Sequence, residues 1–116
     1  MKILDRVLSC LLILGGAGHT AGSLQFYKAD PMTQLWSLCA SLFLFLLGAI
    51  NLVRAGRRDD KALAWICLAG GLCWIGASIR FGWLIGNLLD FRAVVFVVIT
   101  LGLCAMCLRT LTRHQL

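Results

Sequence analysis

Residues 35–53 read LWSLCASLFLFLLGAINLV, a stretch of nineteen positions without a charged side chain. An α-helix rises about 1.5 Å per residue, so a stretch of this length matches the hydrocarbon core of a bilayer, which is about 30 Å thick. Inside lipid, only helices and closed barrels satisfy their own backbone hydrogen-bonding groups. The stretch therefore predicts a transmembrane helix.

Three similar apolar runs fill most of the remaining chain, with charged residues gathered between them. We expect four spans at about residues 3–20, 34–54, 62–85 and 90–109. The chain is 60% hydrophobic, with a mean hydropathy of +0.89, which is outside the usual range of soluble domains. The sequence predicts an all-α integral membrane four-helix bundle, with residues 1–116 forming a single transmembrane domain.

The net charge of +6 is arranged as the positive-inside rule requires, which explains it without a nucleic-acid partner. Basic residues on the two sides of the predicted bundle number eight and three: Lys2, Arg6, Arg54, Arg57, Arg58, Lys61, Arg109 and Arg113 against Lys28, Arg80 and Arg92. We therefore expect a multi-pass protein of the cell inner membrane, in contact with membrane lipids and with both termini in the cytoplasm.

All six cysteines fall inside the predicted spans, where disulfide frameworks are not expected. They are Cys10, Cys39, Cys67, Cys73, Cys104 and Cys107. We interpret them as small packing residues. The spacing Cys104-x-x-Cys107 imitates a metal site, but His19 lies at the opposite side of the membrane, so we expect no metal and no cofactor.

Polar residues from all four spans gather at the predicted outer side of the membrane. They form one hypothetical ligand-binding pocket in the outer leaflet, together with two tryptophans that would serve as its walls: His19, Ser37, Trp74, Arg80, Trp83, Asn87 and Asp90. Trp74 lies mid-span, where it is either a packing residue or the wall of a cavity.

Of these residues, Arg80 has the highest free-energy cost in a membrane. Apolar positions follow it before its helix can end, so its charge lies inside the predicted span. Two interpretations stay open. Arg80 pairs with Asp90, the nearest acid in the sequence, or it offers its guanidinium to an anionic or carbonyl-bearing ligand.

Glycines near the outer end of the first span predict close helix packing, since small residues in membranes usually face another helix. Gly15, Gly18 and Gly22 lie in or beside the run GGAGHTAG, and Gly76 lies on the same face as Arg80. His19, within the run, either hydrogen-bonds across the bundle or exchanges protons and holds a ligand.

The inner half offers two further polar residues. We expect Asp5 to pair with Arg6, with Arg109 or with nearby backbone, and Asn51 to hydrogen-bond across helices. Both are interpreted as contacts that hold the bundle together.

The Gly-His run and the segment Trp74-Ile75-Gly76-Ala77-Ser78-Ile79-Arg80 resemble the small four-helix bacterial membrane proteins grouped near DoxX. The resemblance implies a four-helix membrane fold. It brings no catalytic residue with it.

These features predict a non-enzymatic accessory protein that docks other membrane helices, with a membrane-protein partner or as a homo-oligomer. The alternative is a protein that binds or transports a lipid, a quinone or another amphipathic small molecule through the outer-leaflet pocket. An enzyme ranks last, since the sequence has no Glu and brings no base and nucleophile together.

Overall fold

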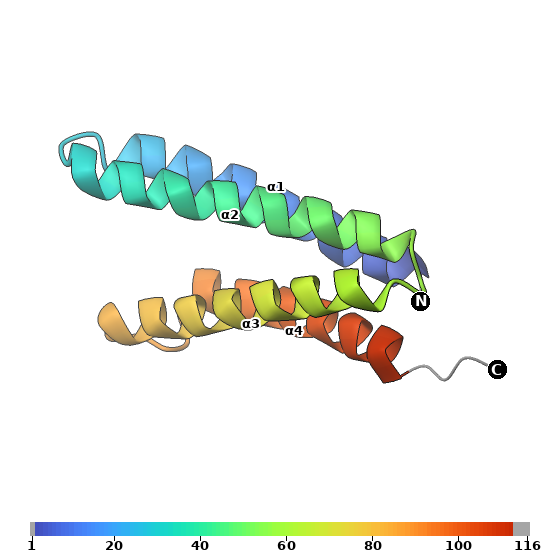
Figure 1. The fold of residues 1–116 in the computed structure, drawn as a ribbon. Helices are drawn as coiled ribbons and strands as arrows, with labels where there is room; N and C mark the ends of the chain where they lie inside the picture. Colours follow the sequence, from blue (N-terminus) through green and yellow to red (C-terminus); the bar gives the residue numbers. More distant parts are fainter. Residues whose placement is uncertain (1, 113–116) are drawn as a thin grey trace.

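The computed structural model describes residues 2–112, and all four of its elements are helices. They are α1 (Lys2–Phe26), α2 (Pro31–Ala55), α3 (Lys61–Leu84) and α4 (Phe91–Thr112), shown in Figure 1. Each helix is long and apolar enough to cross a membrane. The predicted all-α four-helix architecture is confirmed, and the protein is a multi-pass membrane protein. Arg113, which was counted toward its orientation, lies outside the described residues.

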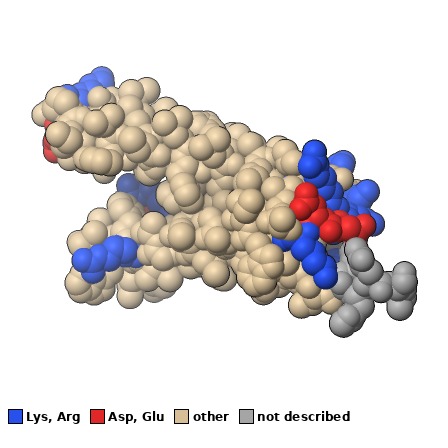
Figure 2. All heavy atoms as spheres, in the orientation of Figure 1, with Lys and Arg blue, Asp and Glu red and all other residues tan. Residues whose placement is uncertain are grey.

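The four helices form two antiparallel pairs, here called the first hairpin (α1 and α2) and the second hairpin (α3 and α4). The hairpins pack together near the N-terminus and the end of α4, and diverge toward the other end (Figure 1). Most Lys and Arg side chains in view lie where the hairpins meet, which we call the basic end (Figure 2). At the opposite, open end, the surface is hollowed into a wedge between the two hairpins.

Aspartates start two of the helices. Asp30 precedes α2, and its carboxylate accepts from the backbone N–H of Thr33 at 3.2 Å and from the Thr33 hydroxyl. These hydrogen bonds hold the pKa of Asp30 below its usual value. Pro31 occupies the first turn, where no backbone N–H is needed. At the basic end, Asp60 accepts from the N–H of Leu63 at 2.9 Å and starts α3 in the same way.

The turn between α3 and α4 depends on a glycine. Gly86 has a φ of 74°, in the left-handed region that residues with a Cβ disfavour. Its N–H donates to the carbonyl of Trp83 at 3.1 Å, and the N–H of Asn87 donates to the carbonyl of Gly82 at 2.8 Å. This Schellman arrangement ends α3 and turns the chain back into α4.

The first connection is shorter than predicted. The spans predicted at about 3–20 and 34–54 leave residues 21–33 between them, but α1 continues to Phe26 and α2 begins at Pro31, so only residues 27–30 connect the two helices. Ser23 is buried against α2, and its backbone carbonyl accepts a hydrogen bond from the Gln34 side chain. This contact between the helices explains why both extend past the ends of the apolar runs. Polar residues in this part of the chain thus belong to the helices and form contacts between them.

Leucines form the centre of the bundle. Leu12, Leu44, Leu47 and Leu103 are buried together, with contributions from α1, α2 and α4. Each helix also exposes large apolar side chains, among them Leu14, Leu46, Leu72 and Val98. An apolar outer surface of this kind suits lipid rather than water as the surrounding solvent.

Candidate functional site

The predicted residues of the first hairpin form a hydrogen-bonded seam near the open end. Nε2 of His19 lies 3.1 Å from the backbone carbonyl oxygen and 3.2 Å from the hydroxyl oxygen of Ser37. The Ser23 hydroxyl contacts the Ser37 hydroxyl and donates to the carbonyl of His19 at 2.8 Å. Gln34 donates to the carbonyl of Ser23 at 3.3 Å. These contacts join α1 to α2, so the geometry favours the cross-bundle interpretation of His19.

In the second hairpin, Arg80 does not pair with Asp90. Its guanidinium carbon instead lies 4.2 Å from the ring centre of Trp83. Asp90 pairs with Arg92, whose Nε lies 3.1 Å from a carboxylate oxygen. The hydrogen bond from Arg92 holds the pKa of Asp90 below its usual value. The side chain of Asn87 accepts from the N–H of Leu89 at 3.1 Å, so its role is within the turn.

The predicted pocket is therefore divided between the two hairpins. Among residues 2–112, no hydrogen bond or ion pair joins the seam of His19 and Ser37 to the polar groups of Arg80, Asn87 and Asp90. The hairpins diverge before they reach this level (Figure 1).

Trp74 of α3 contacts both hairpins. Its ring stacks on Phe43 of α2 at 5.8 Å between centroids and meets the edge of Phe96 of α4 at 5.6 Å. The indole N–H is buried, and it has no hydrogen-bond partner among the described residues. Trp74 therefore packs between the two hairpins, which favours the packing interpretation.

One of the four predicted packing glycines lies at a close helix contact. A Cβ at Gly15 would lie 2.6 Å from the Phe96 ring, so α1 and α4 approach closely there. A Cβ at Gly18 or Gly76 would meet nothing within 4 Å, and one at Gly22 would meet only Phe26 of the same helix. Within the described residues these three glycines therefore contact no other helix, and their role in helix packing stays a prediction.

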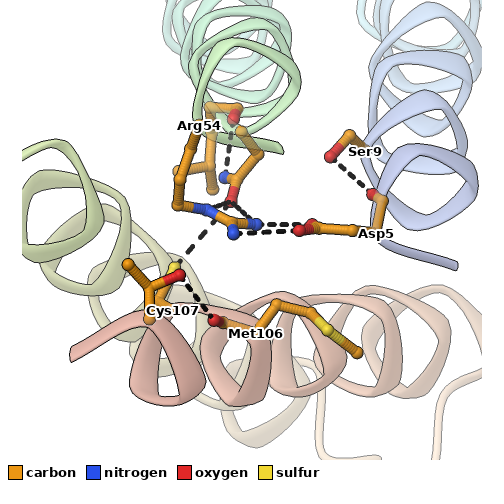
Figure 3. Close-up of polar contacts among 8 residues, drawn as sticks. Asp5, Ser9, Arg54, Met106 and Cys107 are labelled. Carbon is orange, nitrogen blue, oxygen red and sulfur yellow. Dashed lines mark hydrogen bonds and ion pairs between the residues drawn. The ribbon is translucent and has the colours of Figure 1, made fainter. Parts of the chain in front are cut away.

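The deepest polar cluster lies at the basic end, and sequence reasoning did not assemble it (Figure 3). Arg54 of α2 makes a two-pronged ion pair with Asp5 of α1, one contact of which measures 3.0 Å. The Arg54 guanidinium also donates twice to Asn51, at 3.1 and 3.0 Å. Asn51 itself donates to the carbonyl of Leu47 at 2.8 Å. Arg54 is only 2% exposed, so this charge is not a free surface charge.

Helix α4 contributes to the cover over this cluster. The sulfur of Cys107 lies 4.0 Å from the side-chain oxygen of Asn51, and Cys67 of α3 is buried beside Cys107. The ion pair thus belongs to the first hairpin, and the second hairpin helps to keep water from it. Its charge-assisted hydrogen bonds satisfy both charges.

The expected pairing of Asp5 with Arg6 or Arg109 was wrong, although a signal for Arg54 was present. Asp5 lies near the start of the first helix and Arg54 near the end of the second, so an antiparallel pair brings them to one level. Asn51 precedes Arg54 by three positions and therefore shares its face. Arg54 also fits the positive-inside rule, so its position in the sequence has an explanation that does not involve Asp5.

Comparison of the chain with protein-family models, curated proteins and solved structures finds no match. The resemblance to DoxX-like proteins therefore stays a prediction. Function is inferred from the geometry alone.

Proposed function

We propose that this protein is a non-enzymatic helix-docking protein of the membrane, which binds a transmembrane helix of a partner protein on one exposed face of α3. That face, here called the Arg80 face, consists of Ala69, Cys73, Gly76 and Arg80, at helical spacing. All four residues are exposed, and a Cβ at Gly76 would meet nothing within 4 Å. Small residues of this kind let two helix backbones approach closely in lipid.

The observation that carries the proposal is the position of Arg80 on this uncovered face. Four more helical residues follow Arg80 before α3 ends at Leu84, so its charge lies inside the span. Within residues 2–112, Arg80 makes no ion pair, and its contact with the Trp83 ring offsets only part of the cost of a charge near lipid. An acidic side chain on a docked helix would supply the missing partner.

A second copy of the chain fits this requirement poorly. Two copies related by a twofold axis along the Arg80 face would bring like charges together. The acids at the open end are already engaged, Asp30 in a helix cap and Asp90 in an ion pair with Arg92. The proposal therefore commits to a different protein, whose helix carries Asp or Glu at the level of Arg80.

The basic end supports a proposed orientation in the cell inner membrane with both termini cytoplasmic. Five exposed cations lie at or beside the helix ends that form the basic end: Lys2, Arg6, Arg58, Lys61 and Arg109. The positive-inside rule assigns such an excess to the cytoplasm.

The test is affinity capture from native membranes, followed by native mass spectrometry of the complex. We expect one stoichiometric membrane partner that both Gly76→Leu and Arg80→Gln release, while the matched controls Ala105→Leu and Arg92→Gln retain it. Ala105 is an exposed small residue of α4, and Arg92 is an exposed cation at the open end. An acid-to-Arg change in the partner helix should restore binding to Arg80→Asp. A partner bound equally by all variants would contradict docking on this face.

A second function, binding of an amphipathic small molecule, is favoured by one specific observation. The Ser78 hydroxyl is buried and lacks a hydrogen-bond partner among the described residues. It lines an apolar pocket of about 290 Å³ between α3 and α4, together with Ile79, Leu88, Ala93, Val94, Val97 and Val98. A lipid ester or a quinone carbonyl would satisfy that hydroxyl while its apolar body filled the pocket.

Native mass spectra of the purified protein distinguish this second function. A small adduct on the wild-type chain that Ser78→Ala loses, and that Arg80→Gln keeps, would support small-molecule binding in this pocket. A wild-type chain without an adduct would count against it.

A further inference from the structure

A second polar site lies at the basic end, away from the Arg80 face. A pocket of about 50 Å³ opens there between α1, α2 and α4. A buried water needs about 10–15 Å³ on a comparable measure, so the pocket has room for a group of several heavy atoms. Its lining residues are Lys2, Asp5, Arg54, Ala55, Arg58, Met106, Arg109 and Thr110.

The charges of this pocket do not balance. Asp5 is its one acid, and its carboxylate is fully engaged by the buried Arg54 (Figure 3). The remaining cations, Lys2, Arg58 and Arg109, make no ion pair within residues 2–112. The Asp5–Arg54 pair is neutral overall. Among the described residues the pocket therefore keeps three positive charges without a counter-charge, which favours an anion.

The three cations come from three different parts of the chain. Lys2 begins α1, Arg58 lies in the turn between α2 and α3, and Arg109 lies in the last turn of α4. They are exposed, whereas Arg54 is held rigidly by the hydrogen bonds to Asp5 and Asn51. A rigid pair with exposed cations around it suits a phosphate, since guanidinium and ammonium groups both bind phosphate oxygens.

The pocket also lies at the height of the lipid headgroups. Its residues come from the ends of helices that are long enough to cross the bilayer, where the apolar spans stop. Headgroup phosphates occupy this layer, and basic pockets between transmembrane helices are suited to anionic headgroups.

We propose that this pocket binds a negatively charged phosphate group, supplied by the headgroup of an anionic phospholipid of the same leaflet. Lys2, Arg58 and Arg109 contact the phosphate, and the Asp5–Arg54 pair forms the rigid neutral side of the site. The lipid joins α4 to the first hairpin at the basic end. This site is independent of helix docking on α3.

The test compares lipid retention by native mass spectrometry, with phosphatidylglycerol and phosphatidylcholine of identical acyl chains as probes. The variant Arg58→Gln/Arg109→Gln removes two lining cations, and both positions are exposed, so the fold should persist. The matched control Arg6→Gln/Lys61→Gln removes two exposed cations that do not line the pocket.

We expect wild-type protein to retain one phosphatidylglycerol in preference to phosphatidylcholine. At about fivefold per basic residue, Arg58→Gln/Arg109→Gln should weaken that binding by roughly 30-fold, and the control by less than about fivefold. Equal losses in both variants would mean only a diffuse surface attraction and would overturn the proposal.

A parallel titration with inorganic phosphate identifies the source of the phosphate group. Phosphate binding that Arg58→Gln/Arg109→Gln abolishes, without any preference for phosphatidylglycerol, would assign the pocket to a soluble phosphate and overturn the lipid assignment. Phosphatidylglycerol binding that excess inorganic phosphate does not displace would support the lipid headgroup as the occupant.

Discussion

The two hairpins hold their helices together by different means. In the first hairpin, side-chain hydrogen bonds join α1 to α2 at both ends, through the Asp5–Arg54 pair and through the contacts of His19 with Ser37. In the second hairpin, among the described residues, no side-chain hydrogen bond between oxygen or nitrogen atoms joins α3 to α4. There the helices meet through small residues and sulfur, as where Gly71 faces Cys104.

This difference shows two ways to specify a helix pair in lipid, where burial of apolar surface gives no preference between a helix and a lipid chain. Directional hydrogen bonds fix the axial register of the first hairpin, because a shift of one turn would leave a buried charge unpaired. Close packing fixes the second, because shape alone determines which residues can lie opposite one another. Polar substitutions should therefore damage the first hairpin, and changes in volume the second.

The largest effect is expected from Arg54→Met. The change leaves the carboxylate of Asp5 buried without its partner, which typically costs about 3–5 kcal/mol. The loss of stability is measured by unfolding the protein in mild detergent while its helix content is monitored by circular dichroism. Arg80→Met is the matched control, because Arg80 is exposed and makes no ion pair within residues 2–112. An equal response of the two variants would show that the pair does not hold the first hairpin together.

Gly71→Ala tests the second hairpin. A Cβ at this position would lie 2.7 Å from the sulfur of Cys104 and 3.4 Å from a methyl carbon of Thr100, so the helices must separate slightly. We expect a loss of about 1–3 kcal/mol in the same unfolding measurement. Combination with Cys104→Ala should restore much of it. Gly76→Ala, on an uncovered face, should leave stability unchanged. A similar loss of stability there would show that close packing at Gly71 does not hold the second hairpin together.

The smallest effect on stability is expected when a single serine hydroxyl is removed from each hairpin. Ser37→Ala removes contacts to His19 and Ser23 across the first hairpin, and such interhelical bonds average about 0.6 kcal/mol. Ser78→Ala removes a buried hydroxyl of the second hairpin that has no partner among the described residues, so stability should stay the same or rise. Equal losses would indicate an unrecognised hydrogen bond at Ser78.

Much of the fold could be predicted from the sequence, because helix length and hydropathy follow directly from the thickness of the bilayer. Asp30 before Pro31, and Asp60 before α3, are also sequence signals that mark the start of a helix. These signals are local. Each depends on a short stretch of chain and on the solvent around it.

The candidate site was harder to predict, because it depends on how far the helices diverge. All four helices supply polar residues to one side of the membrane, yet the hairpins part there and separate His19 and Ser37 from the polar residues of the second hairpin (Figure 1). Within the second hairpin, Arg80 contacts the Trp83 ring and Asp90 pairs with Arg92. To predict a side-chain pair between two helices, such as Asp5 with Arg54, one must know how each helix is rotated about its axis as well as how deep it lies in the bilayer. Neither rotation nor the angle between hairpins follows from hydropathy.

The location of the Asp5–Arg54 pair within the first hairpin has a consequence for biosynthesis. Both partners lie in the first 54 residues, so the ribosome has made them before the third helix begins. A buried charge left without its partner typically costs about 3–5 kcal/mol. Because the two partners neutralise each other within the first hairpin, the N-terminal half of the chain can satisfy this buried pair before the helices that will later cover it are made.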